Sequence, residues 1–314
     1  MDEPAADAAY AREAIAKGSK SFAAASRLFP PAVRDDVARL YTWCRYADDV
    51  IDGQEHGHGQ REVDDPAAKL AGLRTATDAA LAGARTGDPV FDGFGEVAAR
   101  HGITPRLAHD LLDGFALDVA GARYATADDL ARYCYGVAGS VGVMMALVLG
   151  VPREDADTLD RACDLGLAFQ MTNIARDVVA DAETGRIYLP TDWLAEAGVP
   201  ATPEAVGAPE NRAAVWQVAE RLVRAADAYY RSADVGVARL PFRVAWAIAS
   251  AGRVYRAIGI ERRRAGPQGL ALRAGTTRGQ KLRLIAGAAV SAARGERPGL
   301  AYARGGLWQR PPRP

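Results

Sequence analysis

The sequence Tyr41-Thr-Trp-Cys-Arg-Tyr-Ala-Asp-Asp-Val-Ile-Asp52 sets acidic residues into a helical pattern that is otherwise apolar. Asp48 and Asp52 are four residues apart and share one helix face with Arg45 and Tyr41, which precede them at spacings of three and four. The sequence Gln170-Met-Thr-Asn-Ile-Ala-Arg-Asp-Val-Val-Ala-Asp181 repeats the arrangement, with its polar residues spaced by three, four and four. We call these the first and the second acidic stripe, and they predict two helices that present carboxylates to a common space.

Both stripes have apolar neighbours, such as Ile51 and Ile174, which indicates that they lie inside a bundle. Carboxylates one turn apart repel each other, and burying them is costly unless cations compensate the charge. Mg²⁺ fits this role because it keeps some of its waters and bridges a few carboxylates to substrate phosphates. The pattern therefore predicts metal-assisted diphosphate chemistry. A solvated helix face with incidental acids is the alternative, and it explains one stripe better than two of the same design.

The rest of the chain is also helical in character, because apolar residues recur at spacings of three and four and no alternating strand pattern or hairpin signal is found. Prolines and a polar loop at 54–66 divide the chain. We expect an all-α domain over residues 1–294 and a basic, proline-rich, disordered tail over 295–314. The expected helices are 5–17, 20–28, 32–53, 67–84, 90–100, 105–121, 127–150, 154–181, 209–236, 240–265 and 276–293.

Composition excludes several classes of protein. The 314 residues carry 39 basic and 39 acidic side chains, and this zero balance argues against a nucleic-acid partner. Three cysteines cannot form a disulfide framework, and the apolar run Val137–Val151 is too short to span a membrane. The N-terminus lacks the pattern of a signal peptide, so we expect a cytoplasmic protein. Residues 252–314 hold fourteen cations and two acids, which indicates either a lipid headgroup surface or solvated helix faces.

Several motifs in order carry a family resemblance. They are Ser19-Lys-Ser-Phe22, the two acidic stripes, Tyr133-Cys-Tyr-Gly-Val-Ala-Gly-Ser-Val-Gly142 and Gly185-Arg-Ile-Tyr-Leu-Pro190. With these the chain resembles the squalene/phytoene synthases, which join prenyl diphosphates head to head, and most of all the bacterial phytoene synthases of carotenoid biosynthesis. The resemblance implies a single all-α isoprenoid-synthase bundle around a central cavity.

The resemblance also implies site residues. Those with a catalytic role are Tyr41, Arg45, Asp48, Asp52, Asn173, Asp177 and Tyr188. Those that hold metal are Asp48, Asp49, Asp52, Asn173, Asp177 and Asp181. Those that bind substrate are Ser19, Ser21, Phe22, Tyr133, Val137, Ala138, Gly142, Gln170, Arg176, Tyr255 and Arg273, and Leu165 and Phe169 are further candidates for the wall of the prenyl-tail tunnel.

The activity implied is the condensation of two geranylgeranyl diphosphates to phytoene through a cyclopropylcarbinyl diphosphate, with Mg²⁺, or Mn²⁺ in its place, and no nicotinamide cofactor. Two alternatives remain open at this point. The same chemistry on farnesyl diphosphate would give dehydrosqualene, presqualene diphosphate or squalene, and a non-catalytic prenyl-lipid binder would be expected to lose carboxylates from one stripe. Expected partners are geranylgeranyl diphosphate, the inner membrane surface as a peripheral contact, and the downstream carotenoid enzymes.

Overall fold

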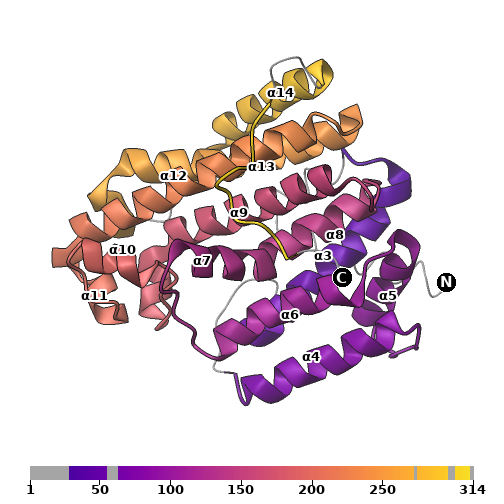
Figure 1. Cartoon of the computed structure of the whole chain (residues 1–314), viewed down its shortest axis with the longest axis horizontal. Coiled ribbons are helices and arrows are strands. Elements are labelled where there is room, and N and C mark those ends of the chain that lie inside the picture. Colours follow the sequence, from indigo (N-terminus) through magenta and orange to yellow (C-terminus); the bar gives the residue numbers. More distant parts are fainter. Residues whose placement is uncertain (1–27, 55–62, 272–273, 296–300, 312–314) are drawn as a thin grey trace.

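A computed structural model describes residues 28–54, 63–271, 274–295 and 301–311. The expected helix 5–17, the expected helix 20–28 up to residue 27, and the site candidates Ser19, Ser21, Phe22 and Arg273 lie outside these residues. Every regular element in the described chain is helical, which confirms the all-α prediction (Figure 1). The elements are α3 (Pro31–Asp52), α4 (Pro66–Leu81), α5 (Pro89–His101), α6 (Pro105–Val119), α7 (Ala127–Cys134), η1 (Tyr135–Gly139), α8 (Ser140–Val148), α9 (Ala156–Glu183), α10 (Thr191–Glu196), α11 (Pro203–Gly207), η2 (Pro209–Asn211), α12 (Arg212–Val237), α13 (Phe242–Ala265), η3 (Pro267–Ala271) and α14 (Arg278–Arg294).

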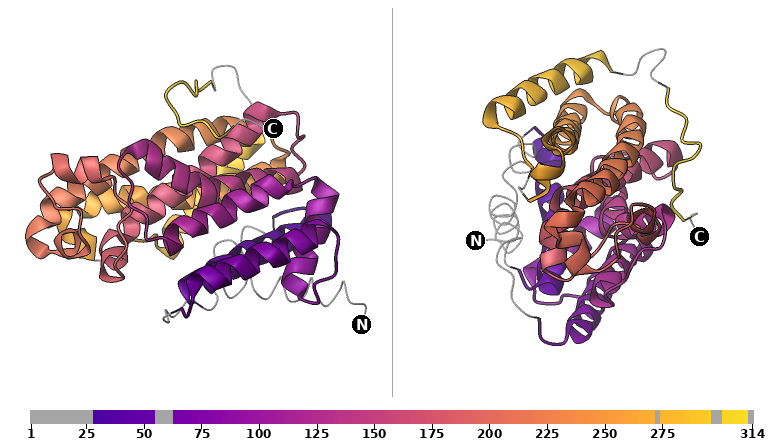
Figure 2. Two further views of the ribbon diagram at one scale, coloured as in Figure 1. Left: turned by 60° about the horizontal axis from the view of Figure 1, so that its bottom comes forward. Right: turned by 90° about the vertical axis from the view of Figure 1, so that its left-hand side faces the viewer.

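Helix α9 is the longest element and lies at the centre of the bundle (Figures 1 and 2). It packs against α12, α8, α13 and the turn η1, and its residues Leu167, Ala168 and Ala175 are fully buried. The approach to η1 is close enough to require glycine, because a Cβ atom at Gly166 would lie 2.2 Å from the carbonyl oxygen of Ala138. This packing fixes the axial position of the second acidic stripe, which occupies the last three turns of α9.

The expected helix 127–150 is interrupted. A π-helical turn, η1, separates α7 from α8, at the place where Gly136 crosses Gly114 of α6. A Cβ atom at Gly136 would lie 2.9 Å from the Cα atom of Gly114, so both helices need glycine there. Among the described residues, Ala127–Val148 is also the one helical stretch whose length and apolar character would suit a membrane span, yet 67% of its most apolar window is buried in the fold. This stretch is therefore part of the buried core, which agrees with the prediction that the apolar run Val137–Val151 does not span a membrane.

The tail differs from the expected disorder over residues 301–311, which cross the outer face of α9 (Figure 1). The Arg304 guanidinium donates two hydrogen bonds to the Asp164 carboxylate, at 2.8 and 2.9 Å, and one to Asp160 at 2.9 Å. The indole of Trp308 packs against Tyr135 of η1, with ring centroids 5.2 Å apart. Basic residues that looked like a solvated tail thus have acidic partners 140 or more positions earlier in the chain.

Candidate active site

The first acidic stripe lies on the last three turns of α3. Arg45 donates to the Asp48 carboxylate at 2.5 Å and lies beside the Tyr41 hydroxyl. Gly53 ends the helix directly after Asp52 in the left-handed conformation, φ 64°, and its N–H donates to the Asp49 carbonyl. The helix therefore stops with its acidic residues at its carboxyl end, where no further turn covers them.

The second stripe lies on α9 and is paired in a similar way. Arg176 binds the neighbouring carboxylate of Asp177 through two of its nitrogens. The Asn173 amide donates to Gln170 Oε1 at 3.5 Å, whereas its buried oxygen, Oδ1, accepts no hydrogen bond from any described residue. A buried acceptor without a donor costs free energy unless a ligand supplies the partner.

Arg186 connects the two stripes. It follows the second stripe in the loop after α9, and its guanidinium contacts Asp52 of the first stripe, with Nη2 2.7 Å from Oδ1. The loop turns back at Gly185, whose φ of 79° favours glycine. The carboxyl end of α3 and the carboxyl end of α9 therefore meet, and the structure brings the sequence-predicted residues of both stripes to one place.

Charge repulsion and burial act together on these acids. Burial raises the pKa of the Asp48 carboxyl to about 7, and the charges of Asp52 and Asp49 add to the rise while Arg45 opposes it. Burial also raises the pKa of Asp181 to about 7, with Asp177 and Asp52 adding to the rise. The site thus holds more negative charge than its own arginines compensate. It is built to receive cations.

A divalent metal fits this donor set, because the carboxylates and the partnerless Asn173 Oδ1 are the hard oxygen ligands that Mg²⁺ prefers. Within the described residues, however, no three carboxylate, histidine or cysteine side chains stand close enough to hold one ion. The arginines account for this spacing, since Arg45, Arg176 and Arg186 each hold a carboxylate that a metal would need. The ion pairs must open before the carboxylates can share a metal.

Asp118 of α6 is a site residue that the sequence analysis missed. Its carboxylate accepts hydrogen bonds from the hydroxyls of Tyr133 and Tyr188, both at 3.0 Å, and these two rings stack with centroids 5.2 Å apart. Burial raises the pKa of Asp118 to about 6, although Arg186 and both tyrosines act in the opposite direction. Asp118 is one of three aspartates in α6, with Asp110 and Asp113, and no spacing rule singles it out or connects it to the stripes. Arg186 was quoted within a motif but not proposed as a site residue.

The aromatic side of the site comes from α9 and α13. Phe169 and Tyr255 pack together with ring centroids 4.4 Å apart. Tyr255 also lies near Tyr41 and Arg176, since its ionised form would raise the pKa of both groups. Tyr255, which the family resemblance suggested as a substrate-binding residue, therefore lies beside the stripes.

Three of the proposed tunnel residues lie at helix crossings. Val137 contacts Gly114, the Ala138 carbonyl contacts Gly166, and a Cβ atom at Gly142 would lie 2.4 Å from the carbonyl oxygen of Ala162. Gly142 thus allows α8 to approach α9 closely. Tyr133 is buried, and its hydroxyl donates the hydrogen bond to the Asp118 carboxylate described above.

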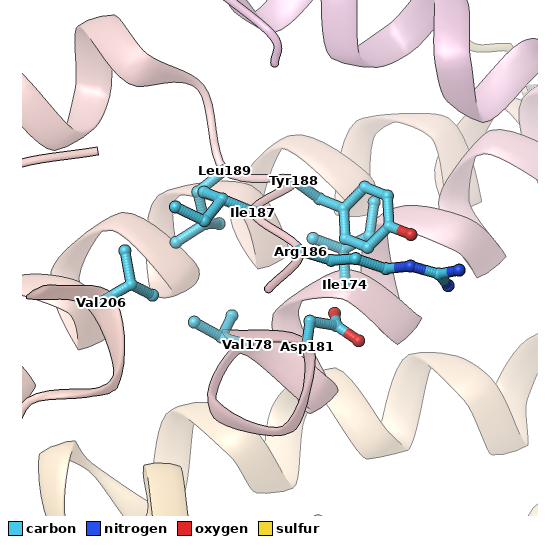
Figure 3. Close-up of a pocket in the computed structure, with 8 residues that line it drawn as sticks. All are labelled: Ile174, Val178, Asp181, Arg186, Ile187, Tyr188, Leu189 and Val206. Atoms are coloured by element: carbon cyan, nitrogen blue, oxygen red, sulfur yellow. The ribbon is translucent and has the colours of Figure 1, made fainter. Parts of the chain in front are cut away.

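A small cavity of about 10 Å³ lies between the second stripe and the loop after it, with room for a single water (Figure 3). Its polar end carries Asp181, Arg186 and Tyr188, whose polar groups lie on the same side in the close-up. Its apolar end is closed by Val178, Leu189 and Val206 among others. The loop is therefore packed against the stripe through apolar contacts and presents its polar groups to the site.

Comparison with known proteins agrees with this geometry. A sequence model of the family described as squalene/phytoene synthase matches residues 15–283. A protein from Pseudescherichia vulneris named phytoene synthase is 53% identical and covers 96% of this chain and 97% of its own length. A protein from a Paracoccus species named 15-cis-phytoene synthase is 50% identical, with 95% and 96% covered. The crystal structure of a dehydrosqualene synthase superposes with a TM-score of 0.80 at 27% identity, over 93% of this chain and 98% of that one.

Proposed function

The chain belongs to the squalene/phytoene synthase family and has its isoprenoid-synthase helical fold, and from this premise we propose that it is a phytoene synthase, a prenyltransferase that joins two molecules of geranylgeranyl diphosphate. The supporting observation is similarity over nearly the whole length, at 50–53% identity, to several bacterial proteins named phytoene synthase or 15-cis-phytoene synthase. All five carboxylates of the stripes, Asp48, Asp49, Asp52, Asp177 and Asp181, are present.

The proposed reaction breaks two carbon–oxygen bonds. In the first half, the diphosphate of one substrate leaves with the bonding electron pair, the double bond of the second substrate attacks the allylic cation, and a proton is lost. The product is a cyclopropylcarbinyl diphosphate. In the second half, this intermediate loses its diphosphate, rearranges and loses a proton to give phytoene. Two geranylgeranyl diphosphates thus give one phytoene, two diphosphates and two protons, and no reductant is consumed.

The metal is Mg²⁺ in this proposal, with Mn²⁺ as a substitute. Family members act on prenyl diphosphates and generally need a divalent cation. The residues that would hold it are Asp48, Asp49, Asp52, Asn173, Asp177 and Asp181. Bound there, it would supply positive charge to the oxygens of the leaving diphosphate.

The arginines have two roles in the proposed cycle. In the structure described here Arg45, Arg176 and Arg186 compensate the stripes. With a divalent cation held by the carboxylates, the three guanidinium groups would be available to the diphosphate oxygens, for which their fork of donors is well suited. Tyr41 and Tyr188 lie beside these arginines and can add hydroxyl donors as charge develops on the leaving group.

Substrate tails need an apolar wall that also keeps water from the carbocation. We assign this wall to Phe169, Tyr255 and Tyr133, together with Val137, Ala138 and Leu165. Gln170 and Asn173 form the start of the second stripe, one residue and one turn after Phe169 of the wall, where their amides can orient the diphosphate end. Ser19, Ser21, Phe22 and Arg273 keep the substrate-binding role implied by the family motifs, and Gly142 permits the helix approach that shapes the wall.

A second candidate is the same chemistry on farnesyl diphosphate. It is favoured by the close superposition on a dehydrosqualene synthase. The test is incubation of the purified protein with Mg²⁺ and geranylgeranyl diphosphate, with farnesyl diphosphate in parallel, followed by identification of extracted hydrocarbons by mass and ultraviolet spectrum. Phytoene from the longer substrate supports the proposal, and a thirty-carbon product from the shorter one alone overturns the substrate. A folded protein that makes neither would be a non-catalytic relative.

The product is a hydrocarbon, so we propose that the enzyme is cytoplasmic and works in peripheral contact with the inner membrane surface. Phytoene released there would dissolve in the bilayer, where the downstream carotenoid enzymes take it up. No nucleic acid and no nicotinamide cofactor take part in this proposal. Sedimentation of the activity with membranes at low salt, and its release at high salt, is the expected behaviour.

A further inference from the structure

The exposed apolar side chains gather on one part of the molecule. In the described chain, the large hydrophobic residues that are exposed are Phe242, Ile260, Leu282 and Val290, and all four belong to α13 and α14. Leu282 is 70% exposed and Val290 is 51% exposed. Figure 1 and the right-hand view of Figure 2 place α14 at the outer edge of the bundle, where it packs against α13. Isolated exposed hydrophobic residues are ordinary, but their confinement to one helix pair is not.

Helix α14 is apolar on two faces. Its inner face contacts α13, where Trp246 donates its indole N–H to the Ile285 carbonyl at 2.9 Å and Ala288 is fully buried. Its outer face carries Leu282, Ala286 and Val290, which are four residues apart and all exposed. Only the inner face is needed to hold the helix on the bundle. The outer stripe therefore has no packing partner in the described part of the chain.

Cations border this outer stripe. Helix α14 contains Arg278, Lys281, Arg283 and Arg294 and no acidic residue. Helical spacing places Arg278 at one edge of the stripe and Arg283 and Arg294 at the other, and all three are exposed. None of the four cations forms an ion pair with a described residue, whereas the arginines of the active site each hold an acid. An apolar stripe between two basic edges is the pattern of a helix that lies in a lipid interface.

We propose that the outer face of α14, with Leu282, Ala286 and Val290 at its centre, is the surface by which this protein binds an anionic membrane. The apolar side chains enter the headgroup boundary, and the arginines at the edges extend to lipid phosphates. A second copy of the chain is a poorer occupant, because a two-fold contact through this face would set its arginines against those of the partner. The inference rests on the proposed function only for the lipid nature of substrate and product.

The test is flotation of the full-length protein with vesicles of phosphatidylcholine alone and of phosphatidylcholine mixed with phosphatidylglycerol. We expect binding to the mixed vesicles at low salt and release at high salt. The variants Leu282→Ser/Val290→Ser and Arg283→Gln/Arg294→Gln should each lower the bound fraction at least tenfold. The control Arg106→Gln/Arg132→Gln removes the same charge from exposed positions on α6 and α7 and should bind as the unchanged protein does.

Three outcomes overturn the proposal. The first is the absence of binding to anionic vesicles, and the second is an equal loss of vesicle binding in the control variant. The third is a dimer in sedimentation analysis that Leu282→Ser/Val290→Ser converts to monomer, which would assign the stripe to self-association. Thermal unfolding of each variant confirms that it is folded. Activity on detergent-dispersed geranylgeranyl diphosphate separates the two proposals. If the α14 variants keep this activity without binding vesicles, both the proposed synthase function and the proposed membrane surface are supported. If the unchanged protein binds vesicles but makes no product, only the proposed membrane surface is supported.

Discussion

Helix α9 carries two pairs of aspartates at the same spacing, and the protein treats them in opposite ways. Asp160 and Asp164 lie near its amino end, and Asp177 and Asp181 near its carboxyl end. The first pair is bound by Arg304 and Arg310 of the C-terminal tail, and Asp164, completely buried, also accepts a hydrogen bond from Ser232 at 2.5 Å. The second pair has Arg176 and the nearby Arg186. Burial raises the pKa of Asp164 as well as that of Asp181, so the two pairs differ in the origin of their arginines.

The difference shows that spacing alone does not make a metal site. Two carboxylates one helical turn apart need positive charge, and the chain can supply it permanently or leave it to a ligand. At the tail the guanidinium groups come from Arg304 and Arg310, in a segment that packs on α9 and η1. At the active site they come from residues that a diphosphate can also bind. We therefore expect the first pair to matter for stability and the second for activity.

The largest effect is expected from Asp177→Asn. It removes one carboxylate that would face the leaving diphosphate, and product formation should fall about a thousandfold, the magnitude found when a group that stabilises transition-state charge is lost. Stability should change little, because relief of the repulsion with Asp181 offsets the loss of the ion pair with Arg176. Measurement of phytoene formation and of thermal unfolding without metal tests both parts.

Asp160→Asn is the matched control on the same helix, with the same chemical change and the same neighbour spacing. It should leave phytoene formation within about twofold and lower the melting temperature instead, because Arg310 and Arg304 lose a charged partner. If the two variants behaved alike in either assay, the division of α9 into a structural and a functional acid pair would be wrong.

Arg304→Met is expected to have the next largest effect, on stability. It leaves the fully buried Asp164 without its guanidinium partner, and breaking a buried pair in this way costs about 3 kcal/mol or more. Urea unfolding measures the loss. The double variant Asp164→Asn/Arg304→Met should recover much of it, because no unpaired charge remains; a double variant less stable than the single one would show that packing of the tail, rather than charge, is responsible.

Arg186→Met extends the comparison to the cation that joins the two stripes. The Arg186 and Asp52 side chains are 30% and 20% exposed, so loss of their ion pair should change stability by less than about 1 kcal/mol. Product formation should fall roughly a hundredfold, since a charge-assisted donor to the diphosphate is lost. Arg221→Met is a suitable control, because its ion pair with Glu196 lies on the surface away from the stripes. Loss of stability without loss of activity would contradict the assignment.

Local patterns predicted much of this molecule. Prolines at 31, 89 and 105 predicted helix starts that the structure has, and the spacing within each stripe predicted helices whose carboxylates meet. The missed features depend on long-range contacts. Asp118 joins the site through Tyr133 and Tyr188, fifteen and seventy residues away, and Arg304 reaches Asp164 across 140 residues. The π-helical turn was missed because it follows from a glycine crossing between α6 and η1, which no pattern within one helix reports.

The smallest effect is expected from Asp118→Asn, and it depends on pH. The native pKa of Asp118 is about 6, above the value of about 3.9 for an unfolded chain. An acid with a raised native pKa binds more protons in the native state between these two values, so its contribution lowers the free energy of unfolding as pH rises through this window.

The asparagine of the variant cannot ionise. The variant should therefore match the unchanged protein near pH 4 and exceed it by about 1 kcal/mol at pH 8, a fraction of the full linkage value because Asp118 is only half-buried and keeps its tyrosine donors. Comparison of urea unfolding at the two pH values cancels the contribution of Asp181, which both proteins share. The Asp118 charge helps to raise the pKa of Asp48, so its loss adds to the difference in the same direction. A constant difference across pH would mean that the Asp118 carboxyl has the same pKa in the folded and in the unfolded chain.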